Sequence, residues 1–127
     1  MLTMKTARTL ILVGLLLTLV TPAAWAHHEV GGYDEDHPVV LDGVVREFVW
    51  ANPHVELFLE VRNPGSGLVL WTLEAGSVQA LAHRGWSRGT LHAGDAVEVL
   101  LAPNRNASHA GRILRITASG GRSLSAR

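Results

Sequence analysis

Hydrophobic and polar positions alternate in the middle of the chain with the period of β-strands. Residues 54–61 (HVELFLEV) show this most clearly, with Val55, Leu57, Leu59 and Val61 on one face and mainly polar side chains on the other. Because successive side chains of a strand point to opposite faces, this pattern predicts a strand with one buried face.

Four further stretches rich in β-branched or other apolar residues are predicted as strands: 39–50, 68–74, 96–102 and 113–117. The first of them is long, and Gly43 within it suits a bulge or a bend. Asn52-Pro53 and residues 62–67 (RNPGSG) predict turns, the second of which makes a hairpin. Residues 103–111 are predicted as a polar loop, and the chain after Gly120-Gly121 as a tail.

One short helix is predicted after the third strand. Ser77 suits the N-cap, Val78, Leu81 and Ala82 recur at helical spacing, and Gly85 ends the pattern. Three strands, a helix and two strands are the order of an all-β, small five-stranded OB-like β-barrel with one short helix between strands three and four. A barrel also closes the edges that a lone sheet would expose. A small β-sandwich is the alternative.

The N-terminus has the three parts of a secretory signal peptide. Lys5 and Arg8 precede the apolar run 10–20, and Ala24-Trp25-Ala26 offers small residues at a cleavage site. The run is shorter than the roughly 20 apolar residues of a membrane-spanning helix. We therefore predict a signal peptide over 1–26, a flexible segment over 27–37 and a barrel domain over 38–127. The mature protein is expected to be periplasmic or secreted, with no stable membrane span.

Composition narrows the classes of partner. The full chain has 11 basic and 11 acidic residues, so cleavage after Ala26 removes Lys5 and Arg8 and leaves a net charge of 9 − 11 = −2. This balance argues against nucleic acid, whose binding depends on clustered positive charge. It also provides no basic patch for an anionic membrane. The chain has no cysteine and therefore no disulfide.

Cleavage after Ala26 would make His27 the first residue, followed directly by His28. Amines and imidazoles titrate near pH 8 and pH 6.5, respectively, so both become nitrogen donors around neutral pH. The amine and Nδ1 of an N-terminal histidine can chelate one metal ion, and His28 can add a nitrogen. Such a site favours Cu(II) over Ni(II) and Zn(II). The alternative is a terminus that binds no metal.

Two later histidines are candidates to complete the site. His54 follows Asn52-Pro53 at the start of a strand, on the face opposite Val55. His37 follows three acidic residues and can equally belong to a solvated loop. No catalytic motif is present, and Glu56 and Glu60 would lie about 13 Å apart on one strand, too far for an acid pair. We therefore do not expect an enzyme.

These motifs together resemble a family of short exported bacterial proteins whose domain has no known function. The motifs that carry the resemblance are His27-His28, Tyr33-Asp34, Gly43-Val44-Val45, Asn52-Pro53-His54, Trp71, Gly76-Ser77, Arg84-Gly85-Trp86, Leu91 and Gly94-Asp95-Ala96-Val97. Glu29 departs from the family, which often has serine there. The resemblance implies a periplasmic β domain and brings no activity.

The sequence thus predicts a small periplasmic protein that binds a copper-type metal through His27 and His28, completed by His54 or His37. Its partner would be this metal ion or another periplasmic molecule. Two alternatives stay open: a structural or partner-binding β domain without metal, and a copper-dependent enzyme with an N-terminal histidine centre.

Overall fold

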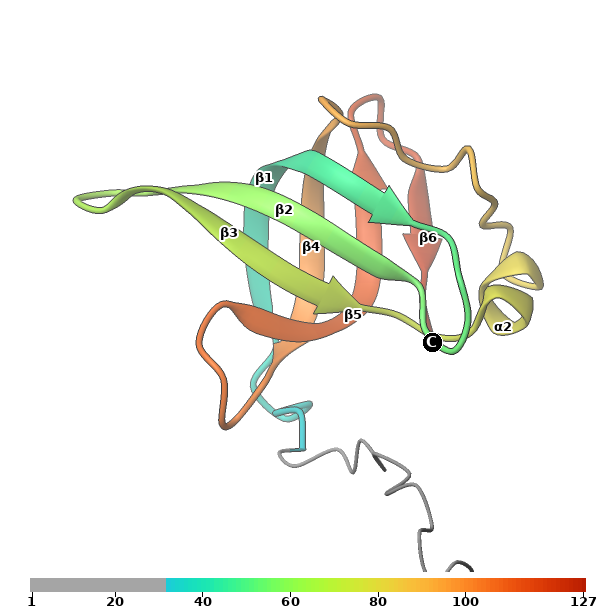
Figure 1. Cartoon of the computed structure of the whole chain (residues 1–127), viewed down its shortest axis with the longest axis horizontal. Helices are drawn as coiled ribbons and strands as arrows, with labels where there is room; N and C mark the ends of the chain where they lie inside the picture. The colour runs from blue at the N-terminus through green and yellow to red at the C-terminus, as the bar shows by residue number, and fades with distance from the viewer. Residues whose placement is uncertain (1–31) are drawn as a thin grey trace, which may run out of the picture.

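The computed structural model describes residues 32–127, which form an all-β domain (Figure 1). Its elements are β1 (Val39–Val49), β2 (Glu56–Asn63), β3 (Gly67–Glu74), α2 (Val78–Ala82), β4 (Ala96–Pro103), β5 (Ala110–Ala118) and β6 (Ser123–Ser125). Within these residues, no helix has the length and apolar character needed to cross a membrane.

The strands close into a five-stranded barrel. Their hydrogen-bonded order is β3-β2-β1-β4-β5-β6, and a parallel pairing of β3 with β5 joins the sheet into a ring. When the short β6 is left out, the strands are paired in the circular order β1-β2-β3-β5-β4-β1. This is the order of an OB-like barrel with the helix between strands three and four. The predicted fold is confirmed, and the sandwich alternative is wrong because one continuous sheet closes on itself.

The first strand coils across both halves of the barrel, as predicted. Residues 39–44 pair with β4, and residues 43–49 pair with β2. A register shift lies between Val45 and Glu47, beyond Gly43. Gly43 serves another need, because a Cβ there would lie 2.7 Å from the backbone oxygen of Glu60 and 2.7 Å from Cγ of Leu59. The glycine therefore lets β2 approach β1 closely.

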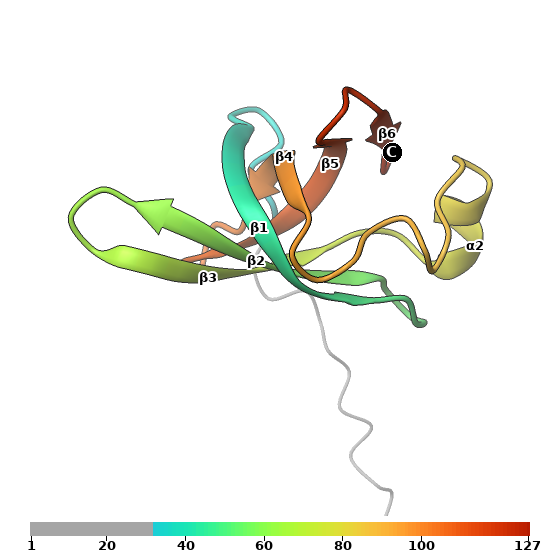
Figure 2. The same cartoon turned by 90° about the horizontal axis from the view of Figure 1, so that it is seen from above.

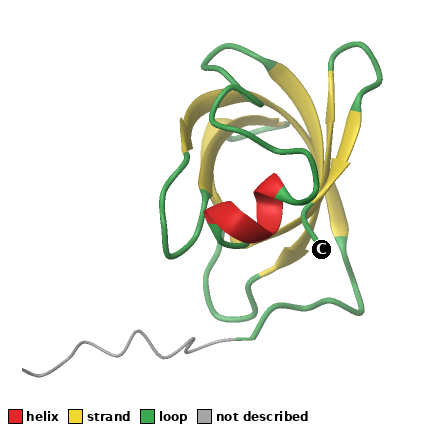
Figure 3. Cartoon of the chain, turned by 90° about the vertical axis from the view of Figure 1, so that its right-hand side faces the viewer, coloured by secondary structure: helices red, strands yellow, loops and turns green. Residues whose placement is uncertain are grey.

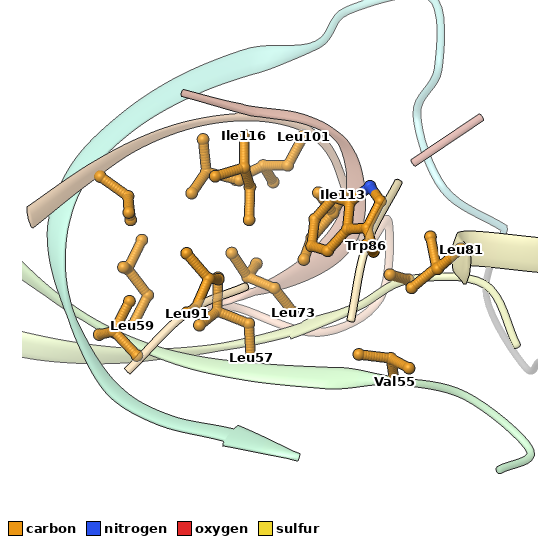
Figure 4. Close-up of a cluster of buried hydrophobic side chains, with 14 residues drawn as sticks. Val55, Leu57, Leu59, Leu73, Leu81, Trp86, Leu91, Leu101, Ile113 and Ile116 are labelled. Atoms are coloured by element: carbon orange, nitrogen blue, oxygen red, sulfur yellow. The ribbon is translucent and has the colours of Figure 1, made fainter. Parts of the chain in front are cut away.

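The inward faces of the strands supply a wholly apolar core (Figure 4). Val55, Leu57 and Leu59 are fully buried, as their alternation predicted. Trp86, in the connection after α2, lies among the core side chains between Ile113 and Leu81. Its indole Nε1 donates a hydrogen bond to the backbone oxygen of Ser125 at 2.8 Å. The bond satisfies the polar atom of a side chain that is almost wholly buried, since only 3% of Trp86 is exposed.

The short helix covers one end of the barrel (Figure 3). Ser77 caps it as predicted, since its Oγ accepts a hydrogen bond from the Ala80 amide at 3.2 Å. A single turn buries little area by itself, so the helix depends on Leu81, which is fully buried in the core.

Two segments differ from the sequence prediction. The strand β5 begins at Ala110, inside the predicted loop 103–111, and β6 lies in the predicted tail. Gly111 and the polar residues before it indicate a loop, yet Gly111 is a strand residue packed against β4. A Cβ on Gly111 would lie 2.5 Å from Cδ1 of Leu101 and 2.8 Å from the oxygen of Ala102. The glycine is therefore required by packing rather than by a turn.

The position of Trp86 allows a stability test. Replacing Trp86 by Ala leaves a cavity in the core and should cost about 3–5 kcal/mol of unfolding free energy. Trp86→Phe keeps most of the ring but loses the bond to Ser125, so it should cost less, about 1–2 kcal/mol. Urea unfolding followed by circular dichroism measures both. Equal losses for the two variants would contradict this packing role.

Candidate functional site

A cavity of about 520 Å³ is bordered by both ends of the described chain and by the barrel wall. The N-terminal segment contributes Glu35, the β1–β2 connection contributes His54, β5 contributes Arg112, and the C-terminal residues contribute Arg127. Ordinary ligand pockets are mostly apolar. This one has charged side chains at its rim, which suit ions or strongly polar groups better than apolar molecules.

Four side chains that line the cavity, together with Glu74 beside it, form a row of alternating charge, which we call the charged row: His54, Glu74, Arg112, Glu35 and Arg127. In that order, the closest nitrogen–oxygen distances between neighbours are 3.7, 3.6, 3.9 and 3.2 Å. The row carries two carboxylates and two guanidinium groups besides the imidazole. Its charge is therefore nearly balanced when His54 is neutral.

Barrel closure positions the middle of the charged row. Glu74 and Arg112 are direct neighbours in the parallel pairing of β3 with β5. Oε1 of Glu74 is inaccessible to solvent and has no hydrogen-bond partner among the described residues. The nearby guanidinium of Arg112 at 3.6 Å compensates its charge. Arg112 also lies over the ring of Tyr33, with its Cζ 4.6 Å from the ring centroid, a cation–π contact.

The Asn-Pro-His segment fixes the position of His54. The Asn52 side-chain oxygen accepts a hydrogen bond from the Val78 amide at 3.1 Å, which ties the β1–β2 connection to the start of α2. Nδ1 of His54 is the ring nitrogen near Glu74, at 3.7 Å from Oε2. The side chain of His54 is 49% exposed. Nε2 is then the ring nitrogen left for a ligand.

The other predicted residues lie elsewhere. The side chain of His37 is 83% exposed, and its Nδ1 lies 3.2 Å from both carboxylate oxygens of Asp34. Within residues 32–127, no three His, Cys, Asp or Glu side chains are grouped so as to hold a metal ion. The predicted ligands His27 and His28 lie outside the described residues. The metal site therefore stays a prediction.

Sequence patterns did not single out Glu35, Glu74, Arg112 and Arg127 as site residues. Each of them looks like an ordinary surface charge in the sequence, since none belongs to a recognisable motif. Only the pairing of β3 with β5 and the contact between the two chain ends bring them to His54. The one available signal was Glu74 itself, which ends an apolar strand three residues before the helix cap Ser77.

The described part of the N-terminal segment is attached to the barrel. Tyr33 forms an isolated β-bridge with Asn104, and the Asp34 amide donates to the Pro103 oxygen at 2.9 Å. The Asp34 carboxylate also faces Arg105 at 3.4 Å. These contacts orient Glu35 toward the cavity. The prediction of flexibility over 27–37 stays a prediction.

The pKa of the Asp34 carboxyl provides a test of this attachment. Partial burial by itself raises its pKa, but the hydrogen bond and charge of His37 and the charge of Arg105 outweigh that effect and lower the pKa below the ordinary 3.8. The stabilisation that ionised Asp34 gives to this attachment is thus fully present above the ordinary pKa and is lost as pH falls through the lowered pKa. A carboxyl carbon NMR titration should find the Asp34 midpoint below 3.8. Arg105→Ala should raise it, whereas Arg122→Ala should not.

A model of a protein family matches residues 15–113 of the chain. No curated protein and no solved structure matches it. The match covers most of the sequence, including the barrel as far as the middle of β5 and the segment that leads into it. It confirms the recognition of a family without known function. The chain therefore belongs to the family of unknown function DUF6152.

Proposed function

We propose that this protein is an exported metal-binding module that holds a copper-type ion between its mature N-terminus and the cavity. The ligands are the α-amine and ring of His27, the ring of His28 and Nε2 of His54. The donor chemistry supports this assignment, because a set rich in nitrogen with no thiolate suits Cu(II) better than other divalent ions of the first row.

The observation that carries the proposal is the position of Glu35. This residue lines the same cavity as His54, where Arg127 binds its carboxylate at 3.2 Å. His28 precedes Glu35 by 35 − 28 = 7 residues, which span at most about 25 Å. A tether of this length would allow the N-terminal histidines to reach His54.

The position of Glu74 next to His54 also supports the proposal. Metal-binding histidines commonly direct the second ring nitrogen at a carboxylate, which orients the ring and strengthens it as a ligand. Glu74 faces Nδ1 of His54 in this way. At 3.7 Å the contact is long for a hydrogen bond, and a small turn of the half-exposed ring would shorten it.

The first prediction concerns processing. The protein purified from the periplasm or the medium should begin at His27, because the signal anatomy places cleavage after Ala26. Intact-mass spectrometry measures this directly. A mature chain that retains residues 10–20 would contradict the predicted export. It would also show that His27 has no free amine to bind a metal.

The second prediction concerns affinity. The mature protein should bind Cu(II) more tightly than Zn(II), and binding should weaken as pH falls because protons compete for the same nitrogens. In titration calorimetry, the double variant His27→Ala/His28→Ala should lose the site. His54→Ala should weaken binding by at least the roughly tenfold to hundredfold that loss of a residue behind a ligand costs in metal sites, because it removes a ligand itself.

Two matched variants separate the ligands from general effects. His83→Ala removes an exposed histidine at the C-cap of α2 and should bind Cu(II) like the wild type. One alanine inserted before His27 displaces the amine without removing a ring and should also lower the affinity. Equal affinity of the wild type and the His27→Ala/His28→Ala variant would rule out the terminal site.

A further inference from the structure

The strand β3 has a free edge. It pairs with β2 along its whole length, but with β5 only at residues 72–74. In the described part of the chain, no strand pairs with residues 68–71 on the side away from β2. The β2–β3 hairpin projects from the barrel on the side opposite α2 (Figures 1 and 2).

The backbone groups at this edge can be assigned. The Thr72 amide donates to the His109 oxygen at 2.9 Å, so the backbone groups of Thr72 face away from β2. Backbone groups of an antiparallel strand face alternate sides, residue by residue. The amide and carbonyl of Leu70 and of Leu68 therefore also face this edge, whereas those of Val69 face β2.

Within the described residues, this edge lacks the usual protection. Natural proteins guard exposed edges with charged side chains, prolines, bulges or a covering element. Residues 67–73 (GLVLWTL) contain no charge and no proline. Leu68 is 61% exposed, the highest value among the large hydrophobic residues of the described chain. Leu70 is 50% exposed, close to the 53% of Val40. The edge thus combines unpaired backbone groups with exposed apolar side chains.

We propose that the β3 edge binds the same edge of a second copy of this chain, antiparallel, about a two-fold axis at Val69. Among residues 32–127, only Leu68 and Leu70 offer free edge-facing groups on this strand, because Thr72 is occupied by His109 and Ser66 lies in the turn. Pairing Leu68 with the partner's Leu70, and Leu70 with the partner's Leu68, uses all of these groups in four hydrogen bonds. A register centred on Leu70 would need Thr72 and is therefore excluded.

The side chains around the edge suit this register. On β2, Arg62 lies beside Leu68 and Glu60 lies beside Leu70. Each row across the joined sheets then reads Arg62, Leu68, the partner's Leu70 and the partner's Glu60. Leucines meet at the centre, and the two ends carry opposite charges, so the register places no like charges opposite each other. The interface is small, which corresponds to a weak, concentration-dependent dimer.

Disulfide trapping tests the register, since the natural chain has no cysteine. In the proposed dimer, Val69 faces the partner's Val69 as a non-hydrogen-bonded pair, with Cα atoms about 4.5 Å apart. A disulfide fits this distance. The Val69→Cys variant should therefore form covalent dimers rapidly under mild oxidation. Leu68→Cys is the matched control, because two copies of this position would lie about 8 Å apart, too far to bridge.

Sedimentation over a concentration series tests the dimer without cysteines. The wild type should associate, Leu70→Lys should remain monomeric, and Val40→Lys should associate like the wild type because Val40 is comparably exposed but lies on β1. A wild type that stays monomeric, or a Leu70→Lys variant that still associates, overturns the proposal. So does cross-linking of Leu68→Cys as fast as that of Val69→Cys. Circular dichroism confirms that each variant is folded.

Discussion

The short parallel pairing of β3 with β5 is the contact on which the rest of the barrel depends. It joins only residues 72–74 to residues 110–112, yet it turns an open sheet into a ring. Gly111 makes it possible, because any side chain there would collide with Leu101 and Ala102 of β4. The same pairing sets Glu74 beside Arg112. One glycine therefore supports both the closure of the core and the electrostatics of the cavity.

The pairing also ends abruptly, and this has structural consequences. His109 adopts a left-handed backbone conformation with φ of 56°, and the chain before it leaves β3. Its carbonyl takes the Thr72 amide as the last bond of that edge, and its ring meets Trp71 edge-on at 5.3 Å between centroids. On one side of this point lie the closed barrel and the cavity. On the other side lies the projecting hairpin, whose outer edge has no cover within the described chain.

Local sequence patterns predicted most of the fold because strand alternation and helix capping depend on residues that are close together in the sequence. The alternation around Leu57 specifies which face is buried, and Ser77 offers an oxygen to the helix start. The missed elements depend on distant contacts. Strand β6 is only three residues long, with Leu124 between two serines, and it is held by pairing with β5, by the packing of Leu124 against the core and by the bond from Trp86. Of the candidate site, sequence patterns singled out His54 but not Glu74 or Arg112, because residues 38 positions apart meet only after closure (112 − 74 = 38). His27 and His28 remain predictions from the sequence alone.

The charged row has a consequence for how the cavity responds to its medium. Its members are between 25% and 54% exposed, so dissolved ions reach most of them. Screening at about 0.15 M salt acts over about 8 Å and weakens such contacts, whereas the apolar core is unaffected by it. Rising ionic strength should therefore loosen the hold of Arg127 and Arg112 on Glu35 while the barrel stays intact. Glu35 would then be held tightly in dilute medium and loosely at high salt concentration, while the β-bridge of Tyr33 with Asn104 keeps the start of the segment on the barrel, so that ionic strength rather than unfolding would control how freely Glu35 moves beside the cavity.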